Sequence, residues 1–150
     1  MEKWNPREDI IYIIRHLSKL LQADFDRRVA EIGLTGAQAR MLFFIIKQTK
    51  DKGLEVHQND IEKEFSLAKS TVNGLTSRLL KTGYIVKRSV NRYAVLEPTQ
   101  EGINAADKIK NGRVETINKL FTGYTEEEKT ITLKKLNILI DNLEGGNKDA

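Results

Sequence analysis

A run of cationic side chains without any acidic neighbour lies in the middle of the chain. Segment 65–96 contains no Asp or Glu, although the whole sequence carries 21 of them. A surface that approaches a polyanion must exclude carboxylates, because a misplaced negative charge repels phosphate as strongly as a Lys attracts it. The segment therefore favours a nucleic-acid partner. Its cations are Lys69, Arg78, Lys81, Lys87, Arg88 and Arg92.

These cations also account for the positive net charge of the protein. The sequence has 25 Lys and Arg residues and a formal net charge of +4. Without the six cations, 25 − 6 = 19 basic residues remain against 21 acidic ones, so the rest of the chain is slightly acidic. The acids could be absent from this segment by chance, or its cations could merely keep an exposed face solvated. The charge pattern alone leaves these alternatives open.

Hydrophobic spacing around the cations predicts a helix-turn-helix. Residues 57–65 and 69–82 each have the apolar spacing of a short helix, and 66–68 between them form a tight turn. Burial of the apolar side turns the polar residues of the second helix outward, toward the major groove of a bound duplex. The inward-facing residues are Ile61, Phe65, Val72, Leu75 and Leu79.

The outward face of the second helix offers two kinds of contact. Its cations suit phosphate, its short polar side chains suit base edges or phosphate, and the positive end of the helix dipole favours anions. We expect Asn73 to contact a base. The candidate DNA-binding residues of this helix are Lys69, Ser70, Thr71, Asn73, Ser77, Arg78 and Lys81.

A β-hairpin is predicted directly after this helix. Segments 84–88 and 92–96 alternate enough to form two strands joined through 89–91. A hairpin in this position is a wing, whose basic tip can press on the DNA backbone or enter the minor groove. We expect Arg92 to make that contact. The candidate DNA-binding residues of the wing are Lys87, Arg88 and Arg92.

Amphipathic helices are predicted on both sides of this lobe. Residues 7–32 carry apolar side chains at spacings of three and four, and Thr35 with Gln38 forms a capping box for a helix toward Lys50. A second capping box at 125–128 precedes a final helix. The apolar faces of the first and last helices exceed what the central lobe can cover, so a homodimer is expected. Its contact residues are Ile10, Ile13, Ile14, Leu17, Leu133, Leu136 and Ile140.

Length and composition agree with a mainly α protein that has a small β-hairpin wing. The 150 residues are 39% hydrophobic and include only two Pro. Within a single chain 1–150, we expect a winged helix-turn-helix lobe at 35–98 and dimerisation helices at 7–32 and 99–143. No apolar run approaches a membrane span, the polar start gives no secretory signal, and the absence of Cys fits an intracellular chain. A cytoplasmic location is therefore expected.

Several segments, taken in order, carry a resemblance to a known family. They are Gln-Asn-Asp-Ile at 58–61, Leu-Ala-Lys-Ser-Thr-Val-Asn-Gly-Leu-Thr-Ser-Arg-Leu-Leu-Lys-Thr-Gly-Tyr-Ile at 67–85, the basic hairpin, and Leu-Glu-Pro-Thr-Gln-Glu-Gly at 96–102. Together they resemble the multiple antibiotic resistance regulator (MarR) family over nearly the whole chain. The resemblance implies a winged-helix homodimer with intertwined first and last helices, which binds a pseudo-palindromic operator in double-stranded DNA and acts as a repressor.

The resemblance further implies release from DNA by a small aromatic effector. Its pocket would lie between the dimer helices and the DNA-binding lobe. Aromatic residues at helical spacing also form hydrophobic cores, so core packing remains an alternative for the candidates. These are Trp4, Tyr12, Phe25, Phe43 and Phe44.

The chain departs from the family pattern at the wing and at two helix caps. Arg92 aligns with the family's wing Arg, but the family's Asp two residues earlier is Val90 here, and the hairpin is short. Both features weigh against insertion of the wing into the minor groove. His57 and Ala68 stand where the family commonly has Ser or Thr, so the cap of the second helix is lost.

Two other function classes remain as alternatives. An enzyme would need a nucleophile with a base or paired carboxylates in a cleft, whereas the chain has no Cys, two separated His and no Gly-x-Ser-x-Gly motif. A winged-helix adaptor for protein contacts would not require an acid-free face. His16 and His57 lack a Cys or second His at ligand spacing, so neither a metal nor a cofactor is expected.

Overall fold

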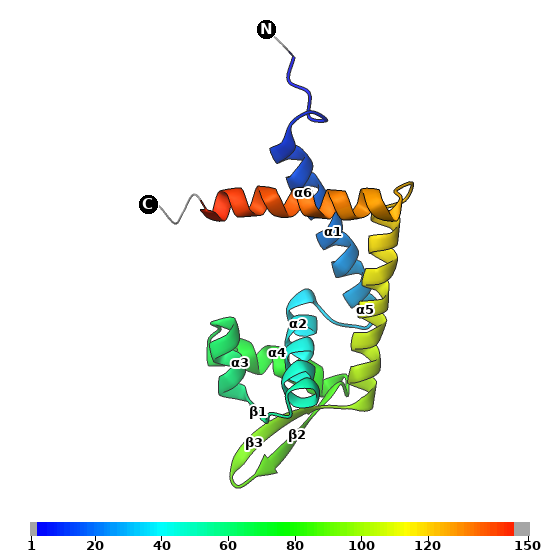
Figure 1. Cartoon of the computed structure of the whole chain (residues 1–150). Helices are drawn as coiled ribbons and strands as arrows, with labels where there is room; N and C mark the ends of the chain where they lie inside the picture. The colour runs from blue at the N-terminus through cyan, green and yellow to red at the C-terminus, as the bar shows by residue number, and fades with distance from the viewer. Residues whose placement is uncertain (1–2, 146–150) are drawn as a thin grey trace. The chain divides into compact units, whose positions relative to one another are not determined.

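Helices dominate both compact units of the chain, residues 1–113 and 114–150, in a computed structural model that describes residues 3–145 (Figure 1). The α-helices are α1 (Ile10–Glu31), α2 (Gly36–Ile46), α3 (Gln58–Phe65), α4 (Lys69–Lys81), α5 (Gln100–Leu120) and α6 (Glu126–Gly145). A π-helical turn, η1 (Lys47–Asp51), follows α2, and the strands are β1 (Val56–His57), β2 (Ile85–Val90) and β3 (Tyr93–Pro98). The predicted fold class, mainly α with a winged helix-turn-helix, is confirmed.

Side chains ahead of three helices accept hydrogen bonds from the first turn. Asp9 accepts from two backbone N–H groups of α1. Thr35 and Gln38 form the predicted capping box of α2. Before α6, Thr125 accepts from the backbone N–H of Glu128 at 3.1 Å, which is one half of the second predicted box. Such caps pair donors that the helix itself leaves open, so the local sequence sets where these helices begin.

The hydrophobic core of the first unit lies among α2, α3, α4 and the small sheet. Val29 of α1 and Ile109 of α5 join it from the flanking helices. Because the same residues that show helical spacing are the buried ones, the core fixes how each helix is rotated. The large side chains buried in α2, the helix-turn-helix and the sheet are Met41, Leu42, Ile45, Ile61, Val72, Leu79, Ile85 and Leu96.

The predicted inward face of α4 is confirmed, with one addition. Val72 and Leu79 are fully buried and Leu75 is half-buried. Thr76 is also buried, and its hydroxyl donates to the sulfur of Met41 at 3.8 Å. The polar face of α4 is consequently directed away from the core.

The sheet has a third strand that the sequence analysis did not predict. Its antiparallel order is β1–β3–β2, and His57 in β1 pairs with Val95 in β3. The expected helix start at His57 is therefore wrong by one residue, and α3 begins at Gln58. Pairing across the sheet holds His57 extended, while the carboxylate of Asp60 accepts its backbone N–H at 2.7 Å.

The β2–β3 hairpin turns more tightly than predicted. Its strands run to Val90 and resume at Tyr93, so the connection is Asn91 and Arg92 rather than 89–91. Both turn residues have positive φ, +47° for Asn91 and +72° for Arg92. Two such residues form the hairpin turn whose twist matches that of the strands. The short wing thus ends with Arg92 at its tip.

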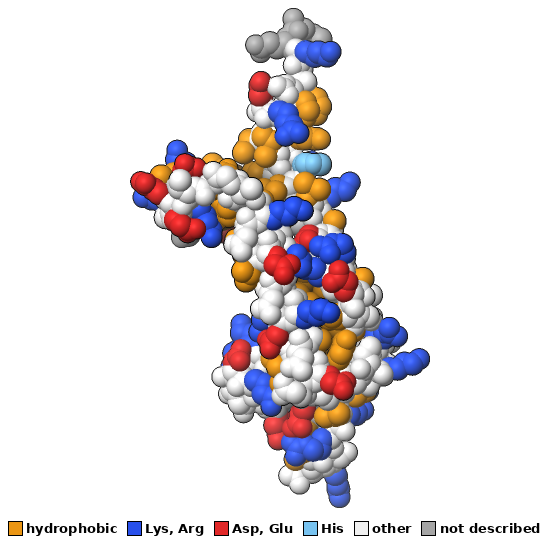
Figure 2. Space-filling model, turned by 90° about the vertical axis from the view of Figure 1, so that its right-hand side faces the viewer, with side chains coloured by type: hydrophobic (Ala, Val, Ile, Leu, Met, Phe, Trp, Pro, Cys, Tyr) orange, Lys and Arg blue, Asp and Glu red, His pale blue; other side chains and the backbone are white. Residues whose placement is uncertain are grey.

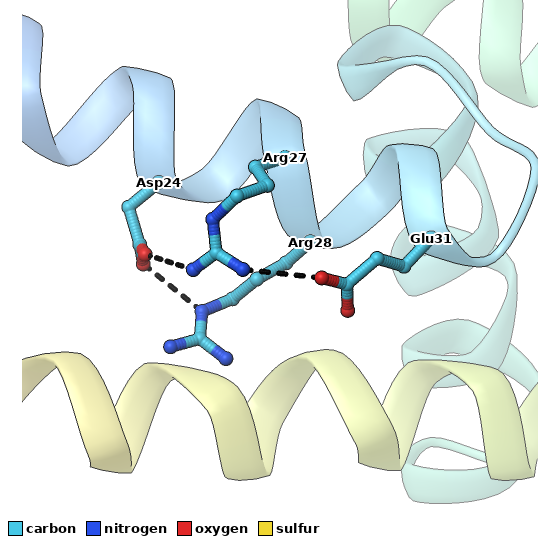
Figure 3. Close-up of polar contacts among 4 residues, drawn as sticks. All are labelled: Asp24, Arg27, Arg28 and Glu31. Atoms are coloured by element: carbon cyan, nitrogen blue, oxygen red, sulfur yellow. Dashed lines mark hydrogen bonds and ion pairs between the residues drawn. The ribbon is translucent and has the colours of Figure 1, made fainter.

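A polar network on α1 lies beside a glycine of α5. Asp24 bonds Arg27 at 2.7 Å and Arg28 at 3.0 Å, and Arg27 also bonds Glu31 at 3.1 Å (Figure 3). A Cβ at Gly112 would lie only 2.4 Å from the Arg28 guanidinium. The missing side chain at Gly112 is what lets Arg28 lie against α5.

Long apolar faces on α1 and α6 stay uncovered in the single chain. The seven residues predicted for the dimer contact are 36 to 54% exposed. α1 buries Val29 alone among its residues, and α6 has no buried residue between Glu126 and Gly145. Contiguous exposed apolar surface of this kind marks an interaction site.

Within residues 3–145, no individual helix has both the length and the apolar character needed to cross a membrane. α1 and the helical segment Gly36–Asp51, bent by 76° relative to each other, pass that test only as a pair.

Candidate nucleic-acid interface

The polar face of α4 is open along its length. All ten candidate DNA-binding residues from the sequence, on α4 and on the wing, have exposed side chains. Since Val72 and Leu79 anchor the opposite side of the helix, this exposure follows from the core. The exposed candidates are Lys69, Ser70, Thr71, Asn73, Ser77, Arg78 and Lys81 on α4, with Lys87, Arg88 and Arg92 on the wing.

The start of α4 carries no side-chain cap. Ala68 stands at the cap position and forms no side-chain hydrogen bond, as the sequence predicted. The N–H groups of the first turn, near Lys69 and Ser70, are thus left for an external acceptor. A phosphate at this end would meet backbone donors and the positive end of the helix dipole.

An open groove runs between the helix-turn-helix and the wing. Its volume is about 850 Å³, and its lining comes from β1, α3, α4 and the β2–β3 wing. From α4 come Lys69 and Asn73, while the wing supplies Lys87, Asn91 and Tyr93. Lys and Arg side chains also gather at the lower end of the molecule in Figure 2, where the hairpin lies in Figure 1. Cations and hydrogen-bonding groups from separate elements therefore meet in one groove.

The groove also contains carboxylates, which the sequence analysis missed. Glu55, Asp60 and Glu62 line it from the β1–α3 side. They lie outside the acid-free segment of the sequence, and the fold returns them to its vicinity. Asp60 is occupied by the backbone N–H of His57. The cationic part of the surface is therefore bounded by acidic groups at the edge that α3 forms.

Two of the six cations are held by groups within the protein. Arg78 donates to the carbonyl of Gly33 at 3.1 Å, which ties α4 to the turn after α1. On the wing, Arg88 forms an ion pair with Glu97, and this hydrogen bond raises the pKa of Arg88 above its ordinary value. Lys69 and Arg92 form no ion pair with any residue in 3–145. The cations of the segment are consequently not equivalent as phosphate ligands.

Three further residues border the groove without having been predicted there. Gln58 donates from Nε2 to Oδ1 of Asn73. The ring of Tyr93, 69% exposed, meets the ring of His57 edge to face at 6.1 Å. Alternation along β3 does not indicate the exposure of Tyr93, because Tyr93 and the buried Val95 are two residues apart and lie on the same face of the strand. Nothing local to Gln58 signals its partner Asn73, 15 residues away, and nothing local to His57 signals the carbonyl of Ala94, 37 residues away.

The aromatic residues predicted for an effector pocket separate into two groups. Phe25, Phe43 and Phe44 are half-buried against the core, which fits the core-packing alternative. Tyr12 is exposed and stacks on His16 at 5.8 Å. It precedes Phe25 by 13 residues on the same helix, a separation of about 20 Å. Within one chain Tyr12 thus lies apart from Phe25, and the effector pocket stays a prediction.

Comparison with known proteins gives a consistent result. A model of the MarR family matches residues 32–92. The chain is 25% identical over 130 residues to the HTH-type transcriptional repressor YetL of Bacillus subtilis (strain 168), covering 85% of this chain and 76% of YetL.

Solved structures share the fold at lower identity. MepR, a transcription regulator of the Staphylococcus aureus multidrug efflux pump MepA, superposes with a TM-score of 0.81 at 21% identity, over 90% of this chain and 98% of MepR. The S. aureus MepR–DNA complex gives a TM-score of 0.60 at 20% identity, over 93% and 99% of the two chains. The winged helix-turn-helix described above is thus a fold that has been solved with DNA.

Proposed function

We propose that this chain, whose residues 32–92 match a model of the MarR family, is a transcriptional regulator of that family and recognises a specific operator sequence in double-stranded DNA. A DNA-binding regulator of transcription is the function common to the family match and the repressor YetL. The observation that carries the proposal is the groove in which α4 and the β2–β3 wing meet, with Lys69, Asn73 and Lys87 along it. A helix with an exposed polar face fits the major groove, and the adjacent hairpin then lies over the backbone.

The residues divide by the contact that each supports. Lys69, Lys87 and Arg92 are exposed cations suited to phosphate, while Ser70 and Asn73 can reach base edges. Arg78 and Arg88 have partners within the protein, so we assign them smaller parts in DNA binding. Thr71, Ser77 and Lys81 remain candidates on the open face of α4.

We further propose that the protein acts as a homodimer. The exposed apolar faces of α1 and α6 support this, because a second copy is an economical cover for two long faces of one chain. In this arrangement 35–98 is the DNA-binding lobe, and helices within 7–32 and 99–143 join the copies. Two lobes related by a two-fold axis would bind inverted half-sites about one helical turn apart.

Repression is the proposed outcome of binding, since YetL is a repressor. Release by a small aromatic effector is proposed from the family resemblance. If Tyr12 takes part in an effector site with Phe25, Phe43 and Phe44, the dimer has to bring it there from the other copy. A DNA partner also makes the cytoplasm the proposed location.

Selection of genomic fragments by the purified protein at ~150 mM salt, near physiological ionic strength, tests the proposal. We expect recovery of an inverted repeat with half-sites about one turn apart. Ser77→Glu, which adds a negative charge to the exposed face of α4, should abolish recovery without unfolding the protein. Recovery of no sequence above background would instead favour the winged-helix adaptor.

A further inference from the structure

A glutamine of α3 holds the asparagine that faces the groove from α4. Gln58, the first residue of α3, donates a hydrogen bond from Nε2 to Oδ1 of Asn73. The two residues are 15 positions apart, so the contact crosses the turn of the helix-turn-helix. Both side chains line the groove, with Gln58 half-buried and Asn73 exposed. The orientation of the exposed amide is thus set by the more buried one.

The backbone on which Gln58 stands is fixed from two directions. His57 pairs with Val95 in the sheet, and its Nδ1 lies 3.2 Å from the carbonyl oxygen of Ala94. Its backbone N–H donates to Asp60 at 2.7 Å. Because strand and helix both restrain this junction, Gln58 can impose an orientation on Asn73.

The direction of the hydrogen bond decides what Asn73 can offer a base. An amide side chain has one acceptor oxygen and an NH₂ group with two donors. The oxygen keeps a second lone pair, but the hydrogen bond from Gln58 turns it toward α3, and residues 3–145 supply no acceptor for Nδ2 of Asn73. The group left to face a ligand in the groove is therefore a donor.

We propose that Gln58 is a positioning residue that makes Asn73 select a base with a major-groove acceptor and reject cytosine. Guanine, adenine and thymine all present an acceptor in the major groove, whereas cytosine presents only its N4 amino donor. Opposite cytosine, the fixed amide would place one donor against another. This inference rests on the proposed function, because it requires α4 to lie in a major groove.

Selection from double-stranded DNA with randomised half-sites tests this role on the full-length protein. The wild type should disfavour cytosine about tenfold at one position, the usual size of a single mismatch. Asn73→Ala should remove this preference. Gln58→Ala should let the amide turn over, so that cytosine is accepted there while preferences at other positions stay.

The variant Gln58→Glu tests whether Gln58 orients the amide of Asn73 or only stabilises the fold. A carboxylate cannot donate, so it would accept from Nδ2 of Asn73 and turn Oδ1 outward. The preference should then invert toward cytosine, even though the added charge weakens binding to every sequence. Gln100→Ala is the matched control, because Gln100 is an exposed amide of α5 that donates to Oδ1 of Asn104 and does not line the groove.

Inversion by Gln58→Glu, together with wild-type selection by Gln100→Ala, supports the inference. If Gln58→Ala and Gln58→Glu both keep the wild-type base preference, the positioning role of Gln58 is overturned. The proposed sequence-specific binding still holds in that case, provided that the wild type enriches a sequence. If the wild type enriches no sequence, the proposed function fails and this inference fails with it.

Discussion

Arg88 and Arg92 belong to one short hairpin but meet different surroundings. Arg88 is paired with Glu97, whereas Arg92 occupies the tip of the turn at a φ of +72°. A non-glycine residue in this region is strained, so an Arg here is unfavourable to the fold itself. In the sequence, both residues count equally as cations. Their environments in the fold distinguish Arg88, which forms an ion pair within the protein, from Arg92, which is available to phosphate.

Arg92→Gly should therefore separate binding from stability. Glycine adopts the positive φ freely, so the free energy of unfolding should stay the same or rise by up to about 1 kcal/mol. Loss of a phosphate contact should weaken binding to all sequences and reduce the salt slope by about one. Denaturant titration and binding at several salt concentrations measure the two effects. Unchanged affinity and salt slope would remove Arg92 from the DNA contact.

The cap of α1 predicts a pH-dependent signal from the single tryptophan. The hydrogen bond from Trp4, followed by those from the backbone, lowers the pKa of Asp9 below its ordinary value of 3.8. Since the folded pKa is depressed, the stabilisation is present above pH 3.8 and is lost as the pH falls through the lower folded value.

Acid titration of Trp4 fluorescence should accordingly show a transition below pH 3.8. Asp9→Asn should remove it, because no carboxyl remains to titrate. Far-UV circular dichroism on the same samples distinguishes loss of this contact from unfolding. An identical transition in the variant would mean that Asp9 does not cause the signal.

Two glycines of α5 allow another part of the chain to pack closely against the helix, whereas a glycine of α4 has no close neighbour. A Cβ at Gly102 of α5 would lie 2.1 Å from the carbonyl oxygen of Tyr84, and one at Gly112 would strike Arg28. Gly74 of α4 has no atom within 4 Å of its Cβ position. Packing thus explains the glycines of α5, whereas Gly74 has open space.

Gly102→Ala and Gly74→Ala should shift stability in opposite directions. The first forces backbone apart and should lower the free energy of unfolding by about 2 kcal/mol or more. The second replaces an unhindered helical glycine and should raise it by about 0.5–1 kcal/mol. Urea denaturation of both variants measures the difference. Equal stability of the two variants would contradict the close contact at Tyr84.

Whole-molecule behaviour depends on surface that a single chain does not cover. The apolar faces of α1 and α6 are each long enough to need a partner, and the core of the first unit lies elsewhere, around α2 and α4. A dimer would explain why helices with few or no buried residues keep so many Ile and Leu. It would also supply the two-fold symmetry that an inverted-repeat operator requires.

Ile14→Glu and Ile140→Glu should therefore dissociate the dimer, because each places a charge on an apolar face. Lys134→Glu, on the opposite side of α6 from Leu136, is the control and should leave the dimer intact. Sedimentation at micromolar concentration measures the change. A monomeric wild type would contradict the dimer proposal, and a dimer unaffected by both Ile variants would place its contact elsewhere.

The sequence by itself determined the helix-turn-helix, the inward face of α4, the cap at Thr35 and the missing side-chain cap at Ala68. Each depends on residues within one or two turns of each other, where periodicity and hydrogen-bonding side chains act locally. The strand at His57 and the contact between Gln58 and Asn73 required the tertiary structure. Their partners are far away in sequence, and no local pattern says which distant groups will meet.

Tertiary structure likewise decided which charges of the candidate site are available. Six cations without a neighbouring acid in sequence gave a uniform expectation of phosphate contacts. In the fold, Gly33 engages Arg78, Glu97 engages Arg88, and Glu55 borders the groove. Electrostatic interactions act through space and not along the sequence. Segment 65–96 therefore determines how many cations the site has, and the packing of the rest of the chain determines what each cation can bind.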